Sequence, residues 1–135
     1  MRSMPLLIAG TILASCTTAP PPPTGPSPKA QMELARAIQG KVPGHPISCL
    51  PNYNANDMTT IDSRTLAFRV GSATTYIVHL TPGCEMIDAG PYALLSRQFG
   101  GSGLCRGDIQ SVIDTLNRST VGSCTIADIV PYTRR

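Results

Sequence analysis

The stretch TLAFRVGSATTYIVHL at residues 65–80 decides the fold. Two runs rich in β-branched and aromatic residues, 65–70 and 75–80, flank a Gly-Ser-Ala-Thr connection, which is typical of a β-hairpin. Because successive side chains of a strand alternate between its faces, the larger apolar residues of each run share one side. These are Leu66, Phe68, Val70, Tyr76, Val78 and Leu80. The segment therefore predicts an antiparallel hairpin in a sheet with one buried face.

Further short strands are expected after this hairpin. Residues 93–99 (ALLSRQF) form one candidate, a glycine-rich turn follows at 100–103, and residues 124–132 form another. Pro131 belongs at the edge or end of that last strand, because proline donates no ladder hydrogen bond. Residues 108–117 remain open: their apolar spacing favours an amphipathic helix, whereas the neighbouring short segments and glycine-rich turns favour a strand.

One helix is expected before the strands. Ser27 is a suitable N-cap, Pro28 suits the first helical position, and Gly40 ends the pattern. The apolar face consists of Ala30, Leu34, Ala35 and Ile38. Twelve residues are marginal as an isolated helix, so this face must pack on the domain. The predicted fold is mainly β, at the margin of α+β: a small antiparallel sheet or partly closed barrel with one N-terminal helix and two disulfides.

The first residues have the layout of an export signal. A positive start precedes an apolar run at residues 4–14, which is too short to cross a hydrocarbon core of about 30 Å as a helix. The sequence Leu13-Ala14-Ser15-Cys16 resembles the lipobox of bacterial lipoproteins, in which the cysteine carries the lipid. The resemblance implies removal of a signal peptide, residues 1–15, and lipidation of Cys16.

A change of composition follows Cys16. Residues 17–28 read TTAPPPPTGPSP and carry no charge, so they have little to bury and form a proline-rich tether. The expected organisation is a signal peptide at 1–15, a lipidated cysteine and tether at 16–28, and a folded domain at 29–135. By resemblance to the sorting rule of bacterial lipoproteins, Thr17 favours the outer membrane.

The cysteine count supports this organisation. Once Cys16 is set aside, four cysteines remain in a chain bound for an oxidising compartment, and none has the spacing of a zinc or CxxC redox site. Two structural disulfides are therefore expected, with three connectivities open. Pairing Cys49 with Cys105 and Cys84 with Cys124 is favoured, because it joins both ends of the domain to its middle.

Three short motifs of the domain carry a resemblance. They are GKVPGHPISCL at 40–50, LCRGD at 104–108 and IVPYTR at 129–134. In these motifs, residues 34–135 resemble a family of small exported bacterial proteins of unknown function. The resemblance implies a compact, mostly β domain, a strand at residues 109–114 and a structural role for Cys49 and Cys105. It implies no activity.

The search for catalytic chemistry finds weak candidates. His79 would need Asp62 or Asp88 and a serine to form a triad, and a partly exposed strand histidine is the favoured alternative. Glu85 and Asp88 form a carboxylate pair for which a solvated loop is the favoured interpretation. The Arg106-Gly107-Asp108 tripeptide is interpreted as a turn. No catalytic residue, metal site or cofactor is therefore predicted, and the protein is not expected to be an enzyme.

The charge balance indicates which classes of binding partner to expect. Eleven Lys and Arg against eight Asp and Glu give +3, a dispersed excess that does not indicate a nucleic-acid footprint. Arginine dominates the cations, and the Arg134-Arg135 end suits lipid head groups or anionic polymers.

These observations predict a lipid-anchored protein of the bacterial cell envelope, on the periplasmic face of the outer membrane. Its domain is expected to be a non-catalytic binding or structural module. The expected partners are the membrane, through the lipid anchor, and an envelope protein or peptidoglycan. Two alternatives remain: an inhibitor of a periplasmic or foreign hydrolase, which would insert the turn at 100–103 into an active site, and a small envelope enzyme using His79.

Overall fold

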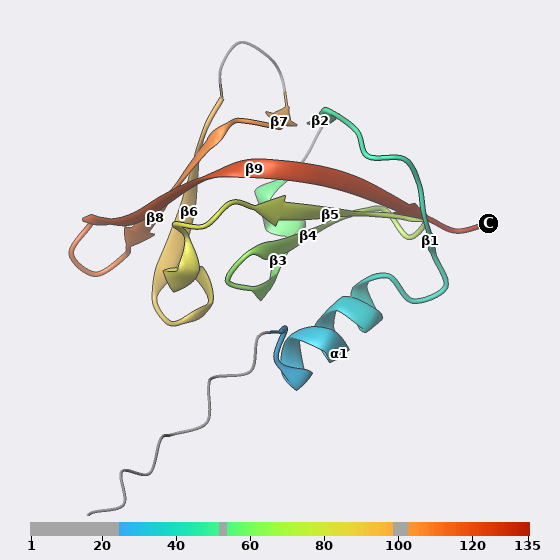
Figure 1. The fold of residues 1–135 in the computed structure, drawn as a ribbon, viewed down its shortest axis with the longest axis horizontal. Helices are drawn as coiled ribbons and strands as arrows, with labels where there is room; N and C mark the ends of the chain where they lie inside the picture. Colours follow the sequence, from blue (N-terminus) through green and yellow to red (C-terminus); the bar gives the residue numbers. More distant parts are fainter. Residues whose placement is uncertain (1–24, 52–53, 99–102) are drawn as a thin grey trace, which may run out of the picture.

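A curled antiparallel sheet forms a half-barrel in this protein (Figure 1). The computed structural model describes residues 25–51, 54–98 and 103–135. The predictions for the signal peptide, the lipobox with Cys16, most of the tether and the turn at 100–102 lie outside these residues. The prediction of a mainly β, partly closed barrel with one helix is confirmed.

The strands follow one another around the half-barrel in an order that is not sequential. The path runs through β3 (Met58–Asp62), β4 (Thr65–Val70), β5 (Thr74–Leu80), β9 (Thr120–Thr133), β8 (Ile109–Asp114) and β6 (Tyr92–Arg97). A short strand, β1 (Val42–Pro43), pairs with β9, while β2 (Cys49–Leu50) pairs with β7 (Leu104–Cys105) in a separate small sheet. Two 3-10 turns, η1 (Ala55–Asp57) and η2 (Glu85–Asp88), complete the elements.

The long strand β9 joins the two halves of the sheet. Its residues 120–125 pair with β8 and its residues 126–133 pair with β5. The strand extends across the whole sheet in Figure 1. Its backbone therefore holds together two hairpin systems that would otherwise be separate sheets.

The predicted hairpin at 65–80 is present as β4 and β5, but the prediction of one buried face is wrong. Leu66 and Val78 pack in the main core inside the half-barrel. Ala67 and Ile77, on the other face, are also buried, because the helix α1 (Pro28–Ala37) lies over them. Val70, expected to be buried, is exposed near the end of its strand.

The helix begins as predicted. The Ser27 hydroxyl accepts a hydrogen bond from the Ala30 amide at 3.1 Å, and Pro28 is the first helical residue. Ala30 is buried in the second core, with Leu34, Ala37 and Ile38 packed against it. Ala35 is exposed, so its place in the predicted apolar face is taken by Ala37.

Residues 109–114 form a strand, and the helical alternative for 108–117 is wrong. β8 lies between β6 and β9, so both of its edges make ladder hydrogen bonds. Gln110, Ser111 and Val112 are consecutive buried residues, which a surface helix would not produce. Pairing on two sides therefore outweighs the helical spacing of the apolar residues.

Pro131 lies close to the predicted end of its strand, two residues before the last residue of β9. It pairs with Tyr76 of β5, while its carbonyl accepts a hydrogen bond from the Gly44 amide at 2.7 Å on the opposite side. The amide and carbonyl of one strand residue point to the same side, so the missing N–H faces the short β1 segment. A Cβ on Gly44 would lie only 3.1 Å from the Pro131 ring, so glycine makes room for the proline there.

Both disulfides have the favoured connectivity. Cys49–Cys105 joins β2 to β7, and Cys84–Cys124 joins the turn after β5 to β9. Cys84 and Cys124 are buried in the main core, whereas Cys49 is exposed.

Candidate functional site

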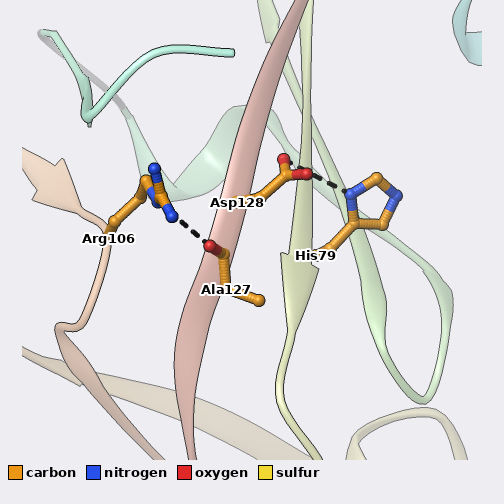
Figure 2. A network of polar contacts seen from close by, with 4 residues as sticks. All are labelled: His79, Arg106, Ala127 and Asp128. Atoms are coloured by element: carbon orange, nitrogen blue, oxygen red, sulfur yellow. Dashed lines mark hydrogen bonds and ion pairs between the residues drawn. The ribbon is translucent and has the colours of Figure 1, made fainter.

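His79 and Asp128 lie side by side on neighbouring strands. They are direct neighbours on β5 and β9, with Nδ1 of His79 3.6 Å from Oδ1 of Asp128 (Figure 2). Asp62 and Asp88, the partners considered from the sequence, lie instead around a hollow at the beginning of α1. The structure therefore does not bring together the residues of the hypothetical triad. The histidine is a partly exposed strand residue.

The Arg106-Gly107-Asp108 tripeptide forms a turn, as interpreted from the sequence. Gly107 has a φ of 85°, and Asp108 is 5 % exposed with its carboxylate accepting the Cys105 amide at 2.7 Å. Arg106 donates from Nε to the Ala127 carbonyl at 3.1 Å, across β9 from His79 (Figure 2). An adhesion motif needs an accessible aspartate, and here the aspartate holds the turn.

Glu85 and Asp88 lie on η2 and both are exposed. The Gly83 amide donates to Oε1 of Glu85 at 2.9 Å, and hydrogen bonds from the backbone lower the pKa of this carboxyl. Asp88 faces the hollow at the beginning of α1. Glu85 therefore holds the turn, and both carboxylates are solvated, as the favoured interpretation expected.

Four cations from separate parts of the chain converge at the other end of the helix. Arg36 comes from the last turn of α1, Lys41 from the loop after it, Arg69 from β4 and Arg134 from the residues after β9. With Gln39 and Ser72 they line a groove of about 220 Å³, which we call the cationic groove. Among the described residues, no carboxylate oxygen lies within 4.0 Å of the four charged groups.

Backbone contacts hold this groove in place. The Lys41 ammonium donates to the Ala37 carbonyl at 3.2 Å, at the C-terminal end of α1, where a cation is favourable. The Arg134 amide donates to the Ala73 carbonyl at 3.1 Å, which ties the chain after β9 to the β4–β5 turn. Partial burial lowers the pKa of Lys41, and the positive charges of Arg134 and Arg69 lower it further. The cations of the groove therefore repel one another, and no carboxylate lines the groove itself.

A second hollow adjoins the cationic groove. It has a volume of about 120 Å³ and shares Arg36 and Arg69 with the groove. We call it the inner hollow. Its lining also includes Glu33 and Asp57, which bring the negative charge that the groove lacks, and Thr75.

Only an indirect signal in the amino-acid sequence pointed to this site. The surplus of arginine and the Arg134-Arg135 end indicated contact with anions, but Arg36, Lys41 and Arg69 carried no motif. They meet because the end of β9 lies beside the β4–β5 turn and because α1 ends over the same corner of the sheet.

Two further properties concern the described residues. In residues 25–51, 54–98 and 103–135, no group of three His, Cys, Asp or Glu side chains is placed to hold a metal ion. No helix within those ranges has the length and apolar character needed to cross a membrane.

No family model, curated protein or solved structure matches this chain. The resemblance of residues 34–135 to small exported proteins therefore stays an expectation.

Proposed function

We propose that this protein is a lipid-anchored, non-catalytic binding module of the bacterial cell envelope that holds an anionic partner in the cationic groove. Cys16 would carry the lipid, and the domain would face the periplasm from the outer membrane. The partner would be an anionic envelope component, either a protein or a glycan polymer such as peptidoglycan. The convergence of Arg36, Lys41, Arg69 and Arg134 is the observation that carries this proposal.

Electrostatics supports an anion as the partner. Bringing like charges together is unfavourable: besides desolvation, which is the larger cause, the positive charges of Arg134 and Arg69 lower the pKa of Lys41. An anion in the groove removes the repulsion and accepts charge-assisted hydrogen bonds from several donors at once. Such complementarity sets both the specificity and the rate of association.

The position of the groove suits an anchored protein. The tether would enter the domain at the beginning of α1, and the groove lies at the end of that helix. Ten helical residues separate the two ends by about 15 Å. A partner therefore has access to the groove without passing the tether.

The anion site is tested by titrating the full chain, purified in detergent, with inorganic phosphate. An Arg69→Gln/Arg134→Gln double variant should bind phosphate at least about tenfold more weakly than the wild type at low salt, because two charge-assisted contacts are lost. The matched control is Arg97→Gln/Arg106→Gln, which removes the same charge outside the groove. Equal affinities in both double variants would contradict the site.

The anchor is tested by fractionating cells that express Cys16→Ala. Without the cysteine no lipid can be attached, so the protein should leave the membrane fraction. A matched Cys49→Ala/Cys105→Ala variant keeps Cys16 and should stay with the membranes. Membrane association of Cys16→Ala would rule out the lipid anchor.

A further inference from the structure

We propose that the outer edge of β6 binds an extended segment of a partner protein, which adds a strand to the sheet and places a large apolar side chain in a groove beside that edge. We call this surface the β6 edge. Among the described residues, its groove shares no lining residue with the cationic groove or the inner hollow. The inference therefore goes beyond the proposed function and does not depend on it.

The groove beside the β6 edge is apolar and has a volume of about 250 Å³. Its apolar walls come from four strands, with Met58, Phe68, Leu94 and Leu104. Its polar lining residues, Ser96 and Gln110, are bonded to each other, with Nε2 of Gln110 donating to Oγ of Ser96 at 2.8 Å. The volume equals that of about eight water-sized groups, so the groove has room for one large apolar side chain.

The backbone groups of Leu94 and Ser96 face away from β8. Asp114 lies opposite Tyr92 in the ladder between β6 and β8, and its amide donates to the carbonyl of Ser119, just before β9. Asp114 and Tyr92 therefore form a pair without mutual hydrogen bonds. Because such pairs alternate with bonded pairs, Leu94 and Ser96 also direct their amide and carbonyl groups outward. Among the described residues, these groups have no hydrogen-bond partner.

The free backbone groups and the groove belong to the same two residues. Leu94 and Ser96 also line the groove. In an added antiparallel strand, the residue opposite Ser96 exchanges both backbone hydrogen bonds with it, and its side chain lies on the same face of the sheet. Backbone hydrogen bonds then provide affinity, while the groove selects a large apolar side chain, which is how strand addition recognises a peptide.

The opposite edge of the sheet is protected against such pairing. β3 has a register shift between Thr60 and Asp62 and ends at the Asp62 carboxylate. Bulges and charged residues are features that keep edge strands from pairing with other chains. β6, by contrast, pairs with β8 without a register shift and carries no charge before Arg97. The β6 edge is therefore the one open to a partner strand.

Arg97 adds a charge preference to the partner segment. It is exposed, and within the described ranges no carboxylate oxygen lies within 4.0 Å of its guanidinium. Opposite charges on directly opposed residues stabilise a strand pair. In an antiparallel partner, an acidic residue directly before the large apolar residue would lie opposite Arg97. β6 itself contains no acidic residue, so a partner protein complements this edge better than a second copy does.

The experiment uses the synthetic peptide acetyl-Thr-Glu-Phe-Thr-Val-Thr-amide, in which phenylalanine is the residue for the groove. Its binding to the full chain in phosphatidylcholine nanodiscs is measured by calorimetry. Replacing the phenylalanine by alanine should weaken binding at least about tenfold, because burial of the aromatic side chain is lost. Absence of binding, or equal binding of the two peptides, would overturn the proposal.

Two N-methylated peptides test the backbone pairing without changing the protein. Methylation of the phenylalanine nitrogen removes the N–H that would donate to Ser96, and should weaken binding about threefold to tenfold. Methylation of the next threonine nitrogen is the matched control, because that N–H lies opposite Leu95 and points away from β6. Equal losses in both peptides would contradict strand addition.

Ser96→Pro and Ser96→Ala test the same contact from the protein. Both variants lose the hydroxyl that Gln110 contacts, but only proline also lacks the outward N–H. Proline is tolerated where the N–H of an edge strand faces outward, and thermal melts of both variants check that they fold. We expect Ser96→Pro to bind the peptide about threefold to tenfold more weakly than Ser96→Ala. Equal affinities in two folded variants would contradict the proposal.

Sedimentation velocity tests a second copy as the occupant of the β6 edge. A wild-type monomer that binds the peptide supports a partner protein. A dimer that dissociates in Ser96→Pro and does not bind the peptide would assign the edge to self-association and overturn the proposal. Neither result affects the phosphate titration of the cationic groove, so the two proposals fail separately.

Discussion

Gly83 lies where the turn after β5 touches the backbone of β9. Its φ of +120° belongs to a region that other residues rarely adopt, and a Cβ there would collide with the Ser123 carbonyl oxygen. A Cβ on Gly122 would in turn collide with the Gly83 carbonyl oxygen. These two glycines let the segments approach closely beside the disulfide between Cys84 and Cys124.

Gly83→Ala should therefore destabilise the protein more than the same substitution does at a glycine with open surroundings. The matched control is Gly71→Ala, which also has a positive φ, +62°, but has no atom within 4 Å of the new Cβ. We expect Gly83→Ala to lower the free energy of unfolding by about 1–3 kcal/mol beyond the loss in Gly71→Ala. Urea denaturation measures both. Equal losses would show that φ strain alone sets the cost.

Some features of single residues were predictable from the sequence, and others were not. The cysteine pairing followed from counting and from the distribution of the cysteines along the chain, and it is confirmed. The unpaired hydroxyl of Thr75 had no such signal, because a period-2 pattern places Thr75 on a solvent face. Only the packing of α1 over that face buries it.

At the scale of elements, α1 turns a one-sided sheet into a two-sided one. Ala30 lies 2 % exposed against Ala67 and Ile77, so small side chains on both elements allow close contact between helix and sheet. A ten-residue helix is too short to be stable alone. Its stability must come from this contact and from its cap.

Ser27→Ala should accordingly cost about 1 kcal/mol of stability, because the Ala30 amide loses its partner. Ser27→Asp is the informative comparison. An aspartate can accept the same hydrogen bond and its charge is favourable at a helix N-terminus, so it should restore wild-type stability or exceed it. Thermal melts of the three proteins test this. A loss in Ser27→Asp equal to that in Ser27→Ala would mean that the cap does not hold the helix.

Element type was predictable where local pattern and tertiary pairing agree. The β4–β5 hairpin has turn residues, alternation and β-branched side chains that all indicate the same structure. Residues 109–114 have helical spacing, and their strand depends on β6 and β9 as neighbours. Pro131 likewise fits near the end of β9 because Gly44 leaves room for its ring and because its missing N–H faces the side where only the short β1 lies. These outcomes depend on partners distant in sequence.

At the scale of the whole molecule, the half-barrel is held by β9 and by two disulfides at different depths. Cys49–Cys105 closes 56 residues of chain and Cys84–Cys124 closes 40. In the chain-entropy model these lengths are nearly equivalent, at about 4 kcal/mol each. The two bridges therefore differ mainly in what surrounds them: Cys84 and Cys124 are buried in the main core, while Cys49 is exposed.

This difference predicts unequal effects when the bridges are removed. Both Cys49→Ala/Cys105→Ala and Cys84→Ala/Cys124→Ala lose the restraint on the unfolded chain. The second variant also leaves a cavity where two sulfur atoms packed in the core, which should add about 1–2 kcal/mol to its loss. Urea denaturation under non-reducing conditions gives both values, and each variant serves as the control for the other. Equal losses would mean that the core around Cys84 and Cys124 relaxes to fill the space, and that chain restraint alone explains both bridges.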